Sequence, residues 1–356
     1  MVFAGRKEYI SILDCYLQRN LVRNGGWLDE VIFIMRATRT VDIVYLHDLT
    51  DSVPEYDLHE IYTKAQDDDK PFDEGYKLCE PDVLYVKIDD DILFLEDHAI
   101  QSIVRRKIND PDYLMVSANV LNQPASSWVT QHHLNASRPY LPETAKPDGF
   151  VDDDRRHMVD WRPSTLPSWE SNSAYNFSVE SPPPFKGHRW LPLGHSGTRY
   201  TPADEMLRHD NASNTTNESS EYLPWTVAAQ RITFQEHYSF LDHLERGQLQ
   251  QYKFDTWTYN RDSRNINFMV FSGNDVIKYP VKGDDGSWFT QTLPSRYNRT
   301  AIVDGSAMAV HFGTRSQTSS SPGVPGRGLR DTDLLRRYRS YATEFICGKP
   351  WGSPMG

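Results

Sequence analysis

The sequence predicts an α/β protein built around a mainly parallel sheet. In the first third of the chain, short apolar segments alternate with segments whose apolar residues recur at helical spacing. The apolar segment 83–86 leads into Asp89-Asp90-Asp91, a pattern typical of a strand that ends at the ligand-binding edge of such a sheet. The hydrophobic content of 38% and the aromatic content of 12% are those of a chain that buries a core.

The elements of the first third follow from these periodicities. Residues 1–4 are short and apolar, and we expect a strand there. Residues 7–19 carry Ile10, Leu13 and Leu17 at helical spacing and predict a helix. Further strands are predicted at 31–34, 43–46, 83–86 and 113–116, and a further helix at 97–107. Short strands separated by helices indicate a mainly parallel sheet with helices on both faces.

Residues 122–224 have a different composition, rich in Pro, Ser, Asn and Asp. A structureless segment of this length would be unusual inside a compact domain. We therefore expect an irregular insertion between two halves of one domain, 1–121 and 225–356. The insertion contains four tryptophans, at Trp128, Trp161, Trp169 and Trp190. Their rings could form a platform on which a ligand stacks, but packing beneath a long loop is the favoured interpretation.

Regular patterns return after the insertion. We expect a long helix at 225–246, strands at 267–271 and 307–312, a short helix at 286–293 and an amphipathic helix at 331–345. The second of these strands ends at His311.

The charge and the hydropathy pattern exclude two classes of protein. The 38 Lys and Arg residues against 49 Asp and Glu residues give a net charge of −11, the wrong sign for a general nucleic-acid partner. No stretch approaches about 18 consecutive apolar residues, so no membrane span is expected in this chain.

The three cysteines, Cys15, Cys79 and Cys347, are far apart in the sequence. Their number and spacing exclude a disulfide scaffold and a CxxC zinc site, and they leave at most one disulfide bond. The chain also contains six Asn-x-Ser/Thr sequences, where chance would give about two. They begin at Asn135, Asn176, Asn211, Asn214, Asn217 and Asn298. This excess favours a secretory compartment.

The Asp89–Asp91 triplet is the most informative motif. Three adjacent carboxylates repel one another, and a divalent cation would relieve that repulsion. Oxygen ligands suit Mn²⁺ or Mg²⁺, which bind through one or two carboxylates together with substrate phosphates. On an extended chain Asp89 and Asp91 would face one side and Asp90 the other. The alternative is a solvated acidic turn, which is our interpretation of the triplets at 67–69 and 152–154.

An Asp-x-Asp at the end of a strand in a nucleotide-binding sheet resembles the GT-A class of metal-dependent, nucleotide-sugar glycosyltransferases. More narrowly, the chain resembles an uncharacterised group of fungal glycosyltransferase-like proteins. The resemblance rests on residues 4–9, 85–91, 236–241, 266–269 and 309–312, which cover most of the chain except the insertion. It implies a GT-A-like fold, a Rossmann-like nucleotide-binding mixed sheet with helices on both faces, plus the large irregular insertion.

The resemblance also implies a metal site. Asp91 and Asp89 would bind Mn²⁺ or Mg²⁺, and either Asp90 or Asp89 would contact the ribose. His311 matches the position of a further metal ligand near the end of the domain. The alternative for His311 is a hydrogen-bonded histidine of the core.

The remaining expected site residues bind the donor or act on the acceptor. Gly5-Arg6 follows the first strand and would contact the nucleotide, although an ordinary helix entry is an equal alternative. Asn119, placed just past a predicted strand, would contact the donor sugar. Asp275, at a strand end, and Asp285 are candidate catalytic bases, with a helix cap as the alternative for Asp285. The pair Glu236-His237 is a further possibility.

These features predict a hexosyltransferase of the EC 2.4 class that moves sugar from a UDP- or GDP-sugar to a glycan, protein or small-molecule acceptor. Two alternatives stay open. One is a GT-A-like protein that binds a nucleotide or a glycan without turnover, and the other is a glycoside hydrolase with paired carboxylates. Relatives of such transferases often reside in the Golgi lumen behind an N-terminal anchor, and no anchor is expected within these residues. We therefore favour the Golgi or secretory lumen, with the cytoplasm as the alternative.

Overall fold

The computed structural model describes residues 1–61, 73–123, 140–141, 159–165, 189–190, 227–261, 266–313 and 329–354. The chain forms two compact units. The first, here called the sheet unit, comprises Met1–Pro124, Lys253–His311 and Ala342–Met355. The second, here called the helical unit, comprises Ala125–Tyr252 and Phe312–Tyr341. Trp128, Trp169, the two acidic triplets at 67–69 and 152–154 and all sequons except Asn298 lie outside the described residues.

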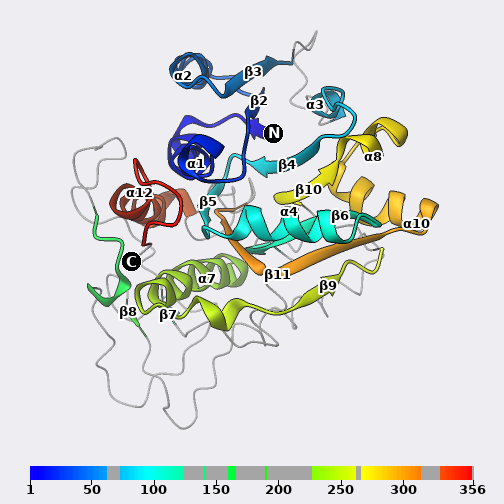
Figure 1. Ribbon diagram of the computed structural model, residues 1–356. Helices are drawn as coiled ribbons and strands as arrows, with labels where there is room; N and C mark the ends of the chain where they lie inside the picture. Colours follow the sequence, from blue (N-terminus) through cyan, green and yellow to red (C-terminus); the bar gives the residue numbers. More distant parts are fainter. Residues whose placement is uncertain are drawn as a thin grey trace. The chain divides into compact units, whose positions relative to one another are not determined.

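The sheet unit contains one mixed sheet, which confirms the predicted α/β class (Figure 1). Its strands are β1 (Val2–Ala4), β2 (Val31–Met35), β3 (Tyr56–Glu60), β4 (Leu84–Asp89), β5 (Ile92–Leu95), β6 (Tyr113–Leu121), β9 (Thr256–Thr258), β10 (Phe268–Ser272) and β11 (Thr300–His311). They are ordered β3-β2-β1-β4-β10-β6-β11-β5, and β9 pairs with β11.

Strand directions define where a ligand could bind. β1 is parallel to both β2 and β4, and the chain runs from β1 outward to β2 and β3 before it returns to the other side of β1 as β4. The strand order therefore reverses between β1 and β4. In open α/β sheets, ligands bind beyond the carboxyl ends of the strands at such a switch point.

The sheet is mixed and not mainly parallel as expected, because β5 and β9 pair antiparallel with β11, and β10 is antiparallel to both of its neighbours. β10 lies between β4 on one side and β6 on the other. Its last residue, Ser272, pairs with Leu84 at the start of β4, so the carboxyl end of β10 lies at the opposite edge of the sheet from the carboxyl end of β4.

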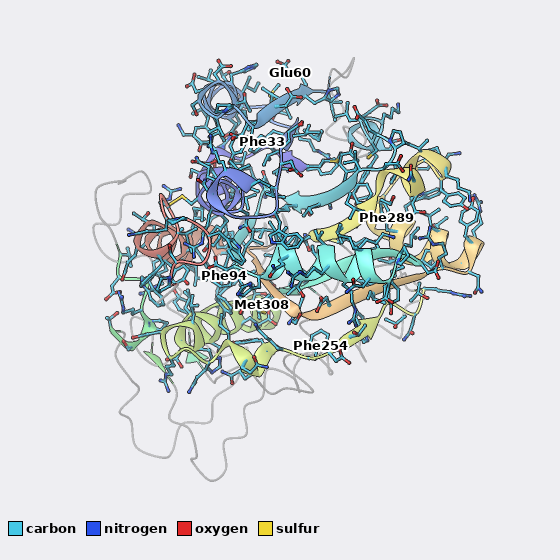
Figure 2. All side chains as sticks on the ribbon, viewed as in Figure 1. Phe33, Glu60, Phe94, Phe254, Phe289 and Met308 are labelled. Carbon is cyan, nitrogen blue, oxygen red and sulfur yellow. A yellow bond between two sulfur atoms is a disulfide. The ribbon has the colours of Figure 1, made fainter. Side chains whose placement is uncertain are left out.

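Helices connect these strands. They are α1 (Lys7–Arg19), α2 (Thr40–Ser52), α3 (Asp73–Tyr76), α4 (Ala99–Asn109), α8 (Gly273–Lys278), α9 (Asp285–Ser287) and α10 (Leu293–Tyr297), with a π-helical turn at Trp288–Thr292. The core between them is apolar, and Phe33 of β2, Phe94 of β5 and Phe289 are fully buried (Figure 2).

The predicted strand at 43–46 is wrong, because these residues lie inside α2. The β-branched residues favour a strand locally, but burial follows helical spacing and falls on Asp42, Leu46 and Leu49. The Asp42 carboxylate also accepts a hydrogen bond from the backbone N–H of Lys7 at 2.9 Å, which ties α2 to the start of α1.

In the helical unit, the structure describes α7 (Val227–Glu245), the short antiparallel pair β7 (Tyr140–Leu141) and β8 (Arg189–Trp190), and the first part of α12 (Leu334–Phe345). Trp161 is buried, and its ring contacts that of Tyr341 with centroids 5.0 Å apart. Trp161 is therefore a packed side chain, and its ring lies against α12. None of the described helices is long and apolar enough to cross a bilayer.

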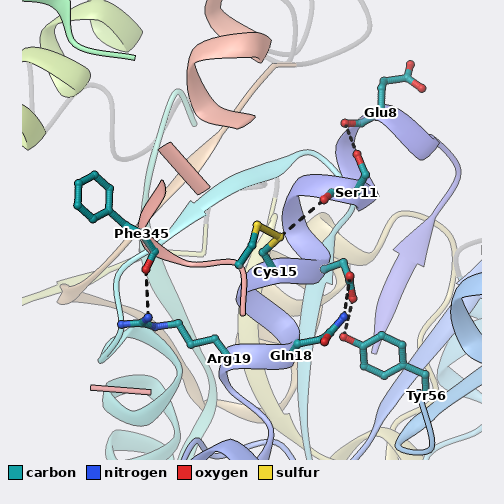
Figure 3. The surroundings of a disulfide bond; sticks show 9 residues. Glu8, Ser11, Cys15, Gln18, Arg19, Tyr56 and Phe345 are labelled. Atoms are coloured by element: carbon teal, nitrogen blue, oxygen red, sulfur yellow. Dashed lines mark hydrogen bonds between the residues drawn. A yellow bond between two sulfur atoms is a disulfide. The ribbon is translucent and has the colours of Figure 1, made fainter. Parts of the chain in front are cut away.

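A disulfide bond joins Cys15 of α1 to Cys347, which follows α12 (Figure 3). It is the single bridge that the cysteine count allowed. Beside it, the unexposed guanidinium of Arg19 forms an ion pair with Asp97 at 2.6 Å. It also donates a hydrogen bond to the carbonyl of Phe345 at 3.3 Å (Figure 3). The C-terminal segment of the sheet unit is thus held on α1 by a covalent bond and by a buried cation.

We predict that the double variant Cys15→Ser, Cys347→Ser lowers the free energy of unfolding by about 2–5 kcal/mol, because the bridge restricts the unfolded chain. Urea denaturation of both proteins measures the difference. A reducing agent should destabilise the wild-type protein and leave the double variant unchanged. Equal stability of the two oxidised proteins would show that the bridge contributes nothing to folding.

Candidate functional site

The Asp triplet lies at the carboxyl end of β4, next to the carboxyl end of β1. Asp89 is the last residue of β4, and Asp90 and Asp91 form the turn that leads into β5. The backbone N–H of Gly5, which follows β1, donates to Asp90 Oδ2 at 2.9 Å. The triplet and the Gly5-Arg6 pair, predicted separately, therefore meet at the switch point of the sheet.

Arg6 bridges two of the three carboxylates. Its Nη2 lies 2.8 Å from Asp91 Oδ2 and also contacts Asp90 Oδ1, while its Nε lies 3.2 Å from both oxygens of Asp90. The side chains of Asp90 and Asp91 are only 5% and 8% exposed, whereas that of Arg6 is 30% exposed. The Arg6 guanidinium, the most exposed of the three groups, thus compensates the charges of both buried carboxylates.

His311, at the end of β11, contacts the same turn. Its Nδ1 lies 3.1 Å from the carbonyl oxygen of Asn122, which can only accept, so Nδ1 carries a proton. Its Nε2 faces Asp91 Oδ2 at 3.3 Å. Burial is the largest single effect and lowers the pKa of His311, but the charge of Asp91 together with the hydrogen bonds to Asp91 and to the Asn122 carbonyl makes the net shift upward. Burial likewise raises the pKa of Asp91, yet His311 and Arg6 reverse this and hold it below its usual range.

Asp89 belongs to a second, buried group of charges. Lys87 precedes it by two residues on the same side of β4 and is 1% exposed. The Lys87 Nζ lies 2.9 Å from Asp89 Oδ1 and 3.1 Å from Asp285 Oδ2, and the Tyr76 hydroxyl donates to Asp285 Oδ2 at 2.7 Å. Burial raises the pKa of Asp89 to about 6, against the opposing effect of Lys87.

Asn267, next to β10, completes the surroundings of Asp89. Its Nδ2 donates to Asp89 Oδ2 at 3.1 Å, and its carbonyl accepts from the backbone N–H of Asp89 at 2.9 Å. Neither Asn267 nor Lys87 was among the expected site residues. A charged residue inside the otherwise apolar strand β4 was the available signal for Lys87, and Asn267 lies in one of the segments that carry the family resemblance.

The expected alternation within the triplet differs from the structure. Asp90 and Asp91 share Arg6, while Asp89 faces Lys87. The strand ends at Asp89, and the turn that follows does not keep the two-residue period of an extended chain.

The structure corrects the expected position of Asn119. β6 extends to Leu121, so Asn119 lies inside the strand and not past its end, and it is completely buried. Its Nδ2 donates to the carbonyl of Gly305 at 3.4 Å. Gly305 lies where β11 departs from regular pairing with β6, between Asp304 and Met308. Asn119 supports this irregular part of β11, and a contact with the donor sugar does not fit its burial.

The structure also corrects the expected position of Asp275. It lies in α8, directly after β10, and forms an ion pair with Arg299. Because β10 runs antiparallel to β4, Asp275 is at the opposite edge of the sheet from Asp91. This placement does not fit a base that acts beside the triplet. The expectation assumed a mainly parallel sheet, in which the carboxyl end of β10 would lie at the same edge as the carboxyl end of β4. Asp285, in contrast, lies within the Lys87 group next to Asp89.

The pair Glu236-His237 lies on α7 of the helical unit, and both residues are buried. The His237 Nε2 lies 2.9 Å from the carbonyl oxygen of Phe312, and its Nδ1 lies 2.9 Å from the Tyr338 hydroxyl. The carbonyl requires a proton on Nε2, so the Tyr338 hydroxyl donates to Nδ1. Both ring nitrogens of His237 are therefore occupied by hydrogen bonds. The expectation of a base at His237 does not fit this arrangement.

The side chains at the triplet can be compared with the ligands that a metal ion requires. Among the described residues, no group of three or more His, Cys, Asp or Glu side chains is placed to hold a metal. The pair of Asp91 Oδ2 and His311 Nε2 nevertheless fits a divalent cation. The two atoms face each other, and the proton on Nδ1 leaves Nε2 as the coordinating nitrogen. Mg²⁺ commonly takes only one or two carboxylates from a protein, with phosphates and water completing its shell.

Comparison with known proteins adds no assignment: no protein-family model matches the chain, and no curated protein matches its sequence. The geometry of the described residues therefore carries the functional argument.

We predict that Lys87→Met lowers the free energy of unfolding by about 3–5 kcal/mol, because Asp89 and Asp285 would stay buried without their cation. Urea denaturation measures the loss. Adding Asp89→Asn and Asp285→Asn to the Met variant should restore much of it, because the buried anions are then removed. A loss below about 1 kcal/mol for Lys87→Met would mean that the two carboxylates are not charged together.

A pH dependence follows from the raised pKa of His311. In EDTA, the stabilising His311–Asp91 pair should be fully present below about pH 6.5 and lost as the pH rises through the pKa of the folded protein. The difference in unfolding free energy between the wild-type protein and His311→Gln should therefore be larger at pH 5.5 than at pH 8.5. His59→Gln, on the edge strand β3, is the matched control. A difference that is constant or grows with pH would contradict the pairing.

Proposed function

We propose that this chain is a metal-dependent glycosyltransferase of the GT-A type, a hexosyltransferase that uses a nucleotide-sugar donor. One observation carries the proposal: Asp91 and His311 face each other at the switch point of the sheet, beside Gly5-Arg6 at the end of β1. A possible cation site and a partly exposed cationic side chain thus lie together at the edge where α/β sheets bind nucleotides.

Asp91 and His311 would hold Mn²⁺ or Mg²⁺, with Asp89 as the nearest further carboxylate of the triplet. When bound, the cation would offset the negative charge that develops on the departing nucleoside diphosphate. Arg6 is the most exposed member of the group and can exchange its carboxylate partners for a phosphate, for which a guanidinium has matching geometry.

Asp90 has a positioning role in this proposal. Its two oxygens accept from the Gly5 backbone and from Arg6, so it fixes the loop after β1 against the turn after β4. Ribose contact then falls to Asp89, whose side chain is 21% exposed. Of the two candidate bases, Asp285 is the one near the triplet, because Lys87 contacts both Asp285 and Asp89.

The disulfide bond and the excess of sequons support a secretory compartment for this activity, since such bonds persist where the environment is oxidising. The acceptor would then be a glycan, a protein or a small molecule of that compartment.

We predict that UDP, GDP or CMP stabilises the protein in the presence of Mn²⁺ and not in EDTA. At about 100 times Kd, one bound ligand should add roughly 2.7 kcal/mol to the free energy of unfolding, which a thermal-shift assay detects. Asp91→Asn should weaken this metal-dependent binding at least about tenfold. Asp255→Asn, whose side chain is 98% exposed, is the matched control and should bind as the wild-type protein does.

Three outcomes distinguish the alternatives. Release of nucleoside diphosphate from one nucleotide sugar, dependent on Mn²⁺ and on Asp91, supports the transferase. Metal-dependent binding without release supports a nucleotide-binding protein. Metal-independent cleavage of a glycoside, or no stabilisation of the folded protein by any nucleotide, would overturn the proposal.

A further inference from the structure

Asn298 lies in the turn between α10 and β11, at the opposite edge of the sheet from the Asp triplet. It opens the tripeptide Asn298-Arg299-Thr300, an acceptor sequence for N-glycosylation. Its backbone angles, φ 51° and ψ 39°, are left-handed and end α10, a conformation that Asn tolerates better than most residues. Asn298 and Thr300 are both exposed to solvent.

The two ends of the Asn298 amide are in different situations. Its Oδ1 accepts a hydrogen bond from the Arg261 Nη2 at 2.8 Å, which fixes the orientation of the amide. Its Nδ2 has no hydrogen-bond partner among the residues that the structure describes. The nitrogen that N-glycosylation modifies is therefore the exposed, unengaged end of an oriented amide.

A cavity of about 310 Å³ begins at this amide. Asn298 and Arg261 line it together with Thr258 and Thr290, so its wall presents hydroxyl and guanidinium groups. Such groups suit the hydroxyl and acetamido groups of a sugar, and a sugar on Nδ2 would be attached to a residue that lines the cavity.

We propose that Asn298 carries an N-linked oligosaccharide whose first N-acetylglucosamine lies in this cavity. In the transfer, Nδ2 forms a bond to C1 of the sugar, and the bond from C1 to a lipid diphosphate breaks. The amide gives up one proton, and the lipid diphosphate leaves. The disulfide between Cys15 and Cys347 indicates the oxidising compartment in which this transfer takes place. The proposal is independent of the site at the Asp triplet.

Occupancy is tested on the full chain, directed by an added leader into the secretory pathway of a yeast that makes high-mannose glycans. Enzymatic release of the glycans in H₂¹⁸O should leave Asp with one ¹⁸O in the peptide that contains position 298. Thr300→Ala should abolish this label and Thr300→Ser should keep it. These variants leave Asn298 in its turn, which Asn298→Gln would disturb. An unmodified Asn298 in the secreted protein would overturn the proposal.

The cavity is tested in a background where the other five sequon asparagines, Asn135, Asn176, Asn211, Asn214 and Asn217, are replaced by Gln. An endoglycosidase trims the glycan at Asn298 to one N-acetylglucosamine. This form should unfold at the temperature of the fully glycosylated form and about 2–4 °C above the unglycosylated Thr300→Ala form. Equal unfolding temperatures for the single-sugar form and the Thr300→Ala form would show that the first sugar does not occupy the cavity.

Discussion

The structure of the candidate site depends on the need to compensate three consecutive carboxylates, of which Asp90 and Asp91 are buried and Asp89 is 21% exposed. A buried anion without a partner costs several kcal/mol, so each aspartate of the triplet requires a cation. Arg6 follows β1, Lys87 lies within β4 and His311 ends β11, and together they meet this need from three parts of the chain. The same ion pairs that compensate the charges hold the ends of these strands together.

β10 shows how one antiparallel strand separates residues by role. It lies between β4 and β6, and its amino end brings Asn267 to Asp89. Its carboxyl end carries Asp275 to the other edge of the sheet, where Arg299 and Lys107 neutralise it. The acidic residues near the two ends of β10 thus have different partners. Only the Asp triplet, at the carboxyl end of β4, lies at the switch point.

The parts of this site that local sequence determines could be predicted. An apolar strand ending in three carboxylates, and a Gly-Arg pair after the first strand, needed only a short window. Lys87 and Asn267 could not be assigned, because their partners depend on which strands are neighbours. The direction of β10 and the full length of β6 also depend on tertiary structure. For this reason the expected positions of Asp275 and Asn119 differ from those in the structure. In α2, burial of Asp42, Leu46 and Leu49 overrides the strand preference of β-branched residues.

The bridge between Cys15 and Cys347 has a consequence for biosynthesis. The two cysteines are 332 positions apart, and chains are synthesised at about 5–20 residues per second, so they leave the ribosome on the order of tens of seconds apart. Throughout that interval Cys15 is present without its native partner, while Cys79 is already available for a wrong one. The sheet unit therefore closes only after Cys347 has left the ribosome, and a thiol isomerase would have most to correct in this period.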